Sequence, residues 1–406
     1  MKNEQHRIVV TGLGIVSVIG QDVASFFANA CAGTVNIGKV ESIDVSRMNS
    51  GRGAEILNFD IQQHFPDRDD IAKLGRAKQL ALAAAKQCLQ SAQFPIAEHA
   101  FEVGVALGYT QGESKTMEMA TDHIAVHGAN GEVDLDAFSD FAPQSVPQQI
   151  AKEFGLNGPI LTIGNACSAS NFAIGLAMDV LRRGDAVAML AGGADAFSRY
   201  GYSGFSRLGA ISPDVPRPFS ADRQGMVPGE GAAMLMLETL ESAQKRGAHI
   251  YAEVIGYGES CDAFHITQPD PSGIVQAASA ALRTAGIDAS AISFISAHGT
   301  GTQASDKAEA RAFAELFGAQ IPPVTSIKSM IGHAMGAASS MECVAAVCSI
   351  QEQIFTPTMN FLSADELCPL DCVPNQARRA PVQTVLKTAS AFGGNNAAVI
   401  FSQFAH

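Results

Sequence analysis

The sequence predicts an α/β protein built from two similar halves. Strand-like runs of apolar, often β-branched residues alternate along the chain with segments whose apolar and alanine residues recur at helical spacing. Strand, helix and strand joined by short connections are typical of a parallel sheet with right-handed crossovers. The order of these runs begins again near residue 251, which indicates an internal duplication, with two similar α/β layers packed around one core.

The first half, taken as residues 1–250, opens with a strand-like run whose glycines at positions 12 and 14 we interpret as a turn. Later in this half, an apolar run ends at a cysteine, and an alanine-rich helical pattern begins directly after it. The expected positions are strands at 7–14, 103–108, 161–163, 186–193 and 232–238, helices at 70–92, 116–127 and 239–246, and a loop at 128–145.

The second half, taken as residues 251–406, repeats this order. A strand at 251–258 corresponds to the first strand and its glycines, a helix at 273–285 to the early helix, and a strand at 292–297 to the strand at 103–108. Residues 326–333 lead into an alanine-rich helix at 334–350, as the cysteine stretch leads into its own helix. No linker rich in proline and glycine lies near residue 250, so we expect the two halves to pack closely.

Composition excludes several classes of protein. The 406 residues are 47% hydrophobic and 17% charged, which is enough for a large core. A net charge of −13 with 27 Lys and Arg argues against a nucleic-acid-binding protein. The start lacks the apolar core of a signal peptide, no apolar stretch reaches the length of a membrane span, and the eight cysteines form no CxxC pair. We therefore expect a cytoplasmic protein without a membrane span.

Three residues at expected strand ends carry the candidate chemistry: Cys167, His298 and His333. Cys167 stands at a strand-to-helix turn, where the amides of a helix N-terminus can stabilise a thiolate. Taken singly, each also fits a structural role, as a small buried thiol or a satisfied core histidine. Because strands of an α/β sheet build their site at the carboxyl edge, we expect the three to converge, and acyl transfer by a cysteine nucleophile uses all of them.

Metal and nucleotide sites fit these residues less well. Zinc accepts one cysteine and two histidines, but the closely spaced ligand pairs typical of zinc sites are absent from the sequence. We therefore predict no metal site. The Gly12-Leu13-Gly14 stretch is too short for a dinucleotide-binding fingerprint, which needs GxGxxG at the start of a helix.

Several motifs together resemble a known family nearly end to end. The chain is similar to the type II elongating β-ketoacyl-acyl carrier protein synthases of the thiolase superfamily, on the motifs at 9–14, 217–227, 229–231, 298–302, 306–309, 328–333 and 392–395. The resemblance implies the thiolase fold, in which duplicated α/β halves form layers in the order αβαβα. It also implies a decarboxylative Claisen condensation with malonyl-acyl carrier protein, giving a 3-oxoacyl-carrier protein and CO2.

The resemblance assigns roles to the three candidate residues. Cys167 would accept an acyl chain from the phosphopantetheine arm of a carrier protein, activated by a low thiol pKa at the helix start. His298 and His333 would hold the malonyl thioester and stabilise the enolate formed as CO2 leaves. Backbone amides of Cys167 and Phe392 would form the oxyanion hole. The arm arrives with the carrier, so no tightly bound cofactor is implied.

The resemblance also implies supporting residues. Lys328, near the histidines, is either catalytic or, with Glu309 and Glu342, part of a buried network that supports them. Thr300 and Thr302 match positions that contact the pantetheine arm. Phe392 and Phe205 match gating aromatic residues, and the small residues Gly393 and Gly394 would let the Phe392 loop move.

Two departures from the family pattern concern the substrate. The fatty-acid enzymes usually have Thr-Ala-Cys-Ala at the nucleophile, whereas this chain has Asn165-Ala166-Cys167-Ser168. Tyr109 and Thr110 stand in the segment expected to line the acyl pocket, where small apolar residues are usual. They would shorten the pocket or suit an unsaturated or oxygenated chain, which leaves open a specialised polyketide or polyene ketosynthase.

The resemblance leaves the partners and two alternative functions open. A dimer is expected, either of two copies or with a ketosynthase-like partner chain. A catalytically silent chain-length partner would normally lack the cysteine, and a thiolase that uses coenzyme A would carry a second catalytic cysteine near its C-terminus. Because the carrier protein is acidic, a local basic patch is expected at the entrance, with Lys73, Arg76, Lys78 and Arg207 as candidates. A solvated helix face is the alternative role of the first three.

Overall fold

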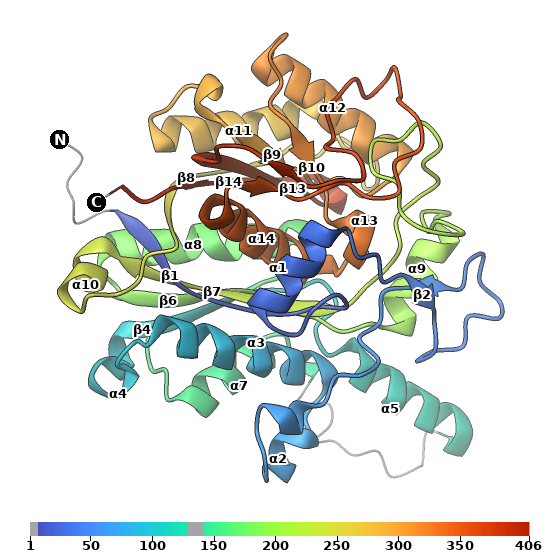
Figure 1. Ribbon diagram of the computed structural model, residues 1–406. Helices are drawn as coiled ribbons and strands as arrows, with labels where there is room; N and C mark the ends of the chain where they lie inside the picture. The colour runs from blue at the N-terminus through green and yellow to red at the C-terminus, as the bar shows by residue number, and fades with distance from the viewer. Residues whose placement is uncertain (1–6, 129–140, 406) are drawn as a thin grey trace.

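The protein forms five layers in the order helices, sheet, helices, sheet, helices (Figure 1). This is a computed structural model, and it describes residues 7–128 and 141–405. Most of the predicted loop at 128–145, namely residues 129–140, lies outside the described residues. The layered arrangement confirms the predicted αβαβα order.

The two halves contain corresponding elements in the same order. The first half contributes β1 (Ile8–Val16), α3 (Arg76–Ala92), β4 (Val103–Gly108), β5 (Ile160–Ile163), α8 (Ala169–Arg183), β6 (Ala188–Asp195) and β7 (Gly231–Thr239). The second contributes β8 (Ala252–Cys261), α11 (Pro271–Ala285), β9 (Phe294–Ser296), β10 (Val324–Thr325), α14 (Ala338–Glu352), β13 (Thr384–Ser390) and β14 (Asn395–Ser402).

The other elements lie around this repeated framework. The first half adds α1 (Val23–Ala32), α2 (Asp69–Ala72), α4 (Ile96–His99), α5 (Ser114–His127), α7 (Ser145–Phe154), α9 (Arg199–Arg207) and α10 (Leu240–Lys245). The second half adds α12 (Gln303–Phe317) and the short α13 (Lys328–Ile331). The predicted helix at 70–92 is interrupted before Arg76, because Gly75 has an extended backbone at the N-terminal end of α3.

The strand order shows the duplication directly. The strands run β10-β9-β13-β14-β8-β1-β7-β6-β4-β5, so the order β5-β4-β6-β7-β1 of the first half is repeated by β10-β9-β13-β14-β8 in the second. Among the residues that the structure describes, only three pairs, between the starts of β1 and β8, join the two five-stranded halves. The division of the chain at residue 250 remains a prediction.

The prediction of a parallel sheet is only partly right. β5, β4 and β6 run parallel, as do β10, β9 and β13, but β7, β1, β14 and β8 pair antiparallel with their neighbours. The β13–β14 connection shows the reason. It spans only residues 391–394, and a connection this short can turn the chain back but cannot carry a crossover helix.

The glycines in the first strand of each half do not form turns, contrary to the prediction. Gly14 lies inside β1, where a Cβ atom would meet the Ala84 carbonyl oxygen of α3 at 2.0 Å. Gly258 has the same place in β8, where a Cβ atom would lie 2.2 Å from the Ala277 carbonyl oxygen of α11. In both halves glycine therefore allows a helix backbone to pack directly on the strand.

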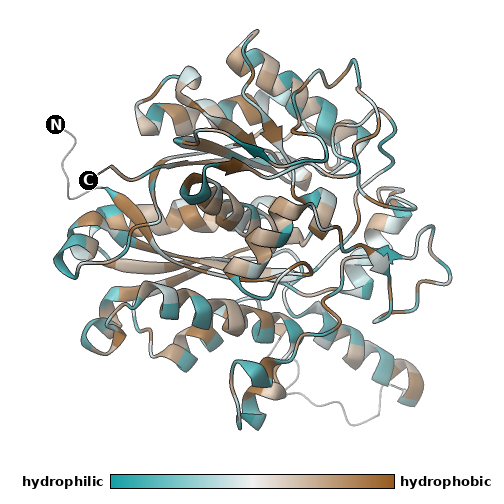
Figure 2. Ribbon diagram, viewed as in Figure 1, coloured by the Kyte–Doolittle hydropathy of each residue, from teal (hydrophilic) through white to brown (hydrophobic). Residues whose placement is uncertain are grey.

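The central layer is buried between the two sheets. α14 is buried on every face from Ala338 to Ile350 and lies beside α8 between the two sheets (Figures 1 and 2). The two outer layers, with α3 and α11, cover the other faces of the sheets and have separate hydrophobic clusters. Because α8 and α14 both begin at turns in this layer, the residues of these turns are brought together. No helix in the described part of the chain is long and apolar enough to cross a membrane.

Candidate active site

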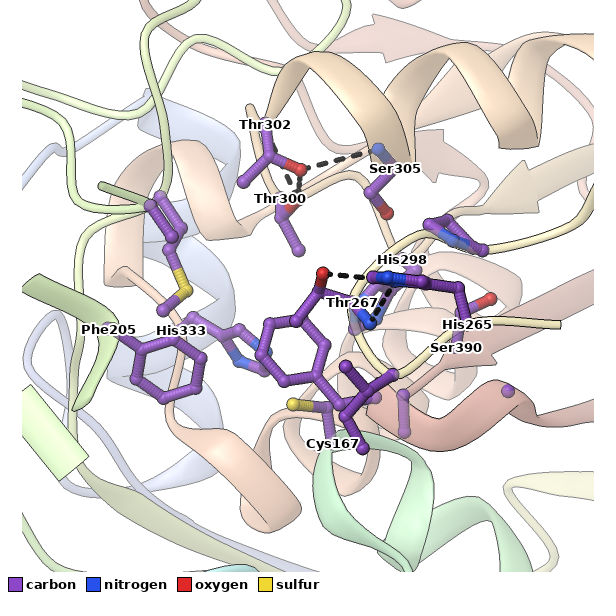
Figure 3. Close-up of a pocket in the computed structure, with 17 residues that line it drawn as sticks. Cys167, Phe205, His265, Thr267, His298, Thr300, Thr302, Ser305, His333 and Ser390 are labelled. Atoms are coloured by element: carbon purple, nitrogen blue, oxygen red, sulfur yellow. Dashed lines mark hydrogen bonds between the residues drawn. The ribbon is translucent and has the colours of Figure 1, made fainter. Parts of the chain in front are cut away.

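Cys167, His298 and His333 line one cavity, as the sequence predicts (Figure 3). The cavity is mostly apolar, and it also contains the aromatic rings of Phe205 and Phe392. Each of the three candidate residues is nearly buried, with exposed fractions of 6%, 4% and 2% in the order named. The convergence of residues from both halves makes this cavity the candidate active site.

Cys167 lies in a strained turn between β5 and α8. The residue before it, Ala166, has φ of +50°, a left-handed conformation that is costly for a residue with a Cβ atom. The second half forms the same turn before α14, with Met335 at φ of +49°, but Gly336 occupies the place of the cysteine. A Cβ atom there would lie 2.5 Å from the Tyr109 carbonyl carbon, so only one of the two turns can carry a nucleophile.

The expected low thiol pKa of Cys167 is wrong. Burial raises the pKa of Cys167 to about 12, although the positive charge of Lys328 acts in the opposite direction. The cost of placing a thiolate in an apolar environment therefore exceeds the stabilisation by the helix start and the nearby cation. The resting cysteine is a neutral thiol at pH 7.

The two histidines lie close together and are uncharged. Their ring centroids are 5.4 Å apart and their planes are nearly perpendicular, at 83°. Burial, with the positive charge of Lys328 as the next cause, lowers the pKa of both His298 and His333 well below the ordinary value. Nδ1 of His333 has no hydrogen-bond partner among the described residues, so this ring can still form a new hydrogen bond.

A buried network of charged groups supports His298. The Glu309 carboxylate accepts hydrogen bonds from the backbone amides of His298, at 2.8 Å, and Gly299, at 2.6 Å. Nζ of Lys328 donates to the His298 carbonyl oxygen at 2.7 Å and lies 3.5 Å from its ring Nδ1. Lys328 also forms an ion pair with Glu342. The predicted group of Lys328, Glu309 and Glu342 is therefore assembled around one histidine.

The residues predicted for the pantetheine arm and the gate also line the cavity. Thr300 and Thr302 hydroxyls lie 3.0 Å apart on one wall (Figure 3). The Phe205 and Phe392 rings have centroids 5.7 Å apart, and Phe392 is 37% exposed. Gly393, which follows it, has φ of +82°, a conformation suited to glycine.

Ser168, one of the departures from the family pattern, does not face the cavity. It is fully buried, and its hydroxyl donates to the carbonyl oxygens of Asn165 and Asn395, each at 3.1 Å. Asn395 begins β14 directly after the loop that carries Phe392 and Gly393. Ser168 therefore ties the nucleophile turn to this loop within the protein.

Tyr109 and Thr110 are not among the described residues that line this cavity. Their role in an acyl pocket remains a prediction.

Asp195 is a buried carboxylate that sequence reasoning missed. It accepts a hydrogen bond from the backbone amide of Thr110 at 2.9 Å, and the amides of Gln111, Gly112 and Gly336 donate to the same carboxylate. Asp195 is fully buried, and burial raises its pKa to about 6.

Two of the four basic residues predicted to dock the carrier protein, Arg76 and Lys78, are not exposed at the surface. The Arg76 guanidinium is partly buried, 2.9 Å from Glu230, and donates to the Ile56 carbonyl oxygen at 2.6 Å. Lys78 is only 2% exposed. Neither lies on a solvated face, because α3 packs into the fold on the side that carries them. Lys73 and Arg207 are exposed and remain candidates.

Other residues of the cavity were not predicted from the sequence. His265, Thr267 and Ser390 all contribute to its lining (Figure 3). The hydroxyl of Ser390 is buried and has no hydrogen-bond partner among the described residues. The described part of the chain contains no group of three or more His, Cys, Asp or Glu arranged to hold a metal ion.

Comparison with known proteins identifies the family. The model of the Beta-ketoacyl synthase, N-terminal domain matches residues 5–243, and that of the Beta-ketoacyl synthase, C-terminal domain matches residues 251–362. The chain belongs to the β-ketoacyl synthase family. This confirms the predicted resemblance, the thiolase-like fold and the prediction of an acyltransferase that forms 3-oxoacyl thioesters.

The chain is similar along its whole length to proteins with different names. The chain is 36% identical over 417 residues to the 3-oxoacyl-[acyl-carrier-protein] synthase 2 of Staphylococcus aureus strain COL, with 99% of each chain covered. It is 36% identical over 401 residues to Nodulation protein E of Rhizobium sp. strain N33, covering 98% of this chain and 99% of that protein. The solved ishigamide ketosynthase/chain length factor has a TM-score of 0.94 and 38% identity, with 98% and 99% covered.

Proposed function

We propose that this β-ketoacyl synthase condenses an acyl group held on Cys167 with a malonyl group held on an acyl carrier protein. The observation that supports this proposal best is the position of Cys167 beside His298 and His333 in one nearly buried cavity. The product is a 3-oxoacyl thioester on the carrier, formed with release of CO2 in fatty-acid or polyketide elongation. A catalytically silent chain-length subunit would not need this combination of residues.

In the first half-reaction Cys167 takes the acyl group. Its sulfur attacks the thioester carbonyl of the acyl-carrier protein, forms a new thioester, and releases the pantetheine thiol. Because the pKa of Cys167 is about 12, its proton must leave during the attack. The neutral imidazoles of His298 and His333 are proton acceptors in the same cavity, and the proton leaves finally on the pantetheine thiol.

In the second half-reaction the malonyl thioester loses CO2. The carbon–carbon bond to its carboxylate breaks, and the electron pair passes to the thioester carbonyl as an enolate. Neutral imidazoles can donate hydrogen bonds to the enolate oxygen, and Lys328 adds positive charge nearby. The enolate carbon then attacks the acyl-Cys167 carbonyl, whose oxygen is held by the amides of Cys167 and Phe392. The Cys167 thiolate leaves and takes up one proton from solvent, which is the proton that the overall condensation consumes.

The carrier protein presents its phosphopantetheine arm through the entrance of this cavity. Thr300 and Thr302 offer hydroxyls to the arm, and the protein itself holds no tightly bound cofactor in this proposal. Arg207 is the stronger docking candidate of the two that remain, because it is exposed and lies two residues after the gate residue Phe205. A local positive charge there would attract an acidic carrier toward a chain whose net charge is −13.

A second ketosynthase-like chain is the expected partner, through the edge of the first sheet. β5 lies at the end of the strand order, and Ile160 on it is 41% exposed. An exposed edge strand can pair with another chain and continue the sheet. Solved relatives include a ketosynthase in complex with its chain length factor from Xenorhabdus doucetiae, and a type II polyketide acyl-carrier protein bound to its ketosynthase. Both a homodimer and such a heterodimer fit the edge of β5.

The two half-reactions can be tested separately. In C167Q the amide side chain occupies the place of the acyl thioester, so malonyl-carrier decarboxylation is expected to continue while condensation stops. H298A and H333A are each expected to reduce decarboxylation by about 100-fold or more, because a hydrogen bond to the developing enolate is lost. The measurement is CO2 release from isotopically labelled malonyl-carrier protein. Full decarboxylation by both histidine variants would refute the assigned roles, and C343A, which changes a buried thiol outside the cavity, is the matched control for C167Q.

A further inference from the structure

Lys387 is a fully buried cation next to the candidate active site, and the chemistry proposed above does not use it. It lies on β13 in the run Thr384–Ser390, whose residues are all buried. Its Nζ lies 2.8 Å from Oε2 of Glu342 and donates to the carbonyl oxygen of Thr388. A buried lysine is retained only where its charge is compensated, so its two partners are the first clue to its role.

Glu342 is shared between two lysines. Lys328 bonds one carboxylate oxygen of Glu342, and Lys387 lies on the other. Nζ of Lys328 in turn donates to the His298 carbonyl oxygen at 2.7 Å. The ion pairs therefore form a continuous chain from Lys387 through Glu342 and Lys328 to His298.

A second path links β13 to the same histidine. The hydroxyl of Thr388, the residue after Lys387, donates to Oε1 of Glu309 at 3.0 Å. Glu309 accepts the backbone amide of His298 at 2.8 Å. The two groups that bond the backbone of His298 are therefore both linked to β13. Lys328 is linked through Glu342 to Lys387, and Glu309 is bonded by Thr388.

The charges in this network balance only when Lys387 is included. The titratable groups around His298 are Glu309 and Lys328, which bond it, Glu342 and Lys387, which are linked to Lys328, and Cys167, His265 and His333, which share its cavity. Two glutamates and two lysines in this set are buried, so removing one lysine leaves an excess of negative charge beside the histidines. Such a charge acts strongly because little solvent screens it.

We infer that Lys387 is a positioning residue for the condensation reaction, which holds Glu342 so that Lys328 stays on His298 and the histidine stays uncharged. The inference rests on the role proposed for His298. Lys387 lowers the pKa of both His298 and His333, after burial and Lys328. It is not among the described residues that line the cavity, so it acts through its neighbours and not on the substrate.

The test is the pH profile of malonyl-carrier decarboxylation in four variants. K387M removes the charge and the hydrogen bond to the Thr388 carbonyl oxygen, K387Q removes the charge but keeps a hydrogen-bond donor, and K387R keeps the charge. R246M is the matched control, because it also removes the cation from a buried glutamate, Glu238, but at the end of α10 and outside the network of His298.

The neutral histidine is the active form, so activity falls at low pH as the histidine becomes protonated, and this fall is the acidic limb of the profile. Loss of the Lys387 charge raises the histidine pKa and therefore moves the acidic limb to higher pH. We expect K387M and K387Q to move this acidic limb upward by about half to one pH unit, with kcat reduced and KM nearly unchanged. K387R is expected to restore the wild-type limb, and R246M to leave it in place. Should K387M not fold, K387Q decides the test.

Two different failures can be told apart. A wild-type profile in folded K387M or K387Q would overturn the inference about Lys387 and leave the proposed function intact. Decarboxylation that persists fully in H298A would instead overturn the role of the histidine. A shift of the limb in R246M as large as in K387M would also overturn the inference, because it would reflect weakened folding and not charge beside His298.

Discussion

Two features of Cys167 have opposite effects on its thiol pKa. A position at a helix start lowers the pKa, and an apolar surrounding raises it. The turn presents the sulfur to the cavity, and burial keeps it protonated. This arrangement suits a nucleophile that acts only when a thioester and its carrier arm fill the cavity. Its raised pKa keeps the thiol protonated and so lowers its reactivity.

The resting thiol is therefore expected to react slowly with iodoacetamide. At pH 7 Cys167 should be alkylated about 10- to 100-fold more slowly than a free cysteine peptide, because little thiolate is present and only part of the loss is offset by its higher nucleophilicity. The rate should rise with pH up to at least pH 9. It is measured by mass spectrometry of the Cys167 peptide, in a C261A background that removes the exposed cysteine. A plateau between pH 6 and 8 would show a low pKa and contradict this account.

At the residue scale, the sequence predicted the reactive groups better than their supports. Cys167 and His298 follow β5 and β9, and His333 follows β10 and the short helix α13, so their convergence could be expected from the order of the elements. Lys387 and Asp195 could not be placed in the same way, because each is a single charge at a strand position whose partners are far away in the sequence. A charged residue within a buried strand pattern was the only available signal. The thiol pKa depends on burial by both halves, which no local pattern records.

At the scale of elements, the duplicated glycines explain how the outer helices pack. Gly14 in β1 and Gly258 in β8 each allow one helix backbone to lie directly on a strand. The turns before α8 and α14 are duplicated as well, but only one carries a thiol. The glycines could be identified in the sequence, but the helix that packs on each strand could not. For this reason they were predicted as turns.

Substitution of these glycines should destabilise both halves similarly. G14A and G258A are each expected to lower the free energy of unfolding by at least about 2 kcal/mol, because the added methyl group meets a helix carbonyl. Denaturant titration measures this change. G38A in β2 (Gly38–Lys39) is the matched control, since no atom lies within 4 Å of a Cβ at that position. Equal stability of G14A and G38A would contradict the packing argument.

At the scale of the whole molecule, the two halves supply complementary parts of one site. The first half carries the nucleophile, and the second carries both histidines, their lysines and the loop of Phe392. The repeated order of runs in the sequence predicted two similar halves, and the matching strand orders of the two halves agree with this. It did not predict the antiparallel strands, because the expected parallel sheet was taken from the strand–helix–strand runs, whereas the connection at residues 391–394 is too short for a crossover.

The edge of β5, which pairs with no further strand in the described part of the chain, is expected to form the subunit contact. I160D places a charge at this edge, so the purified protein should sediment as a monomer where the wild type sediments as a dimer. L367D changes an exposed leucine of the second half and serves as the control. If I160D remains a dimer of unchanged affinity, the contact lies elsewhere.

The central claim is that Cys167 carries the growing acyl chain, and peptide mass spectrometry after co-expression with the cognate carrier protein tests it most directly. The account predicts an acyl mass on the Cys167 peptide in the wild type and in C343A, and none in C167A. The mass itself distinguishes a saturated fatty acyl chain from a polyene or a poly-β-keto chain. An acyl group found on another residue, or no acyl group on Cys167 while condensation proceeds, would contradict the account.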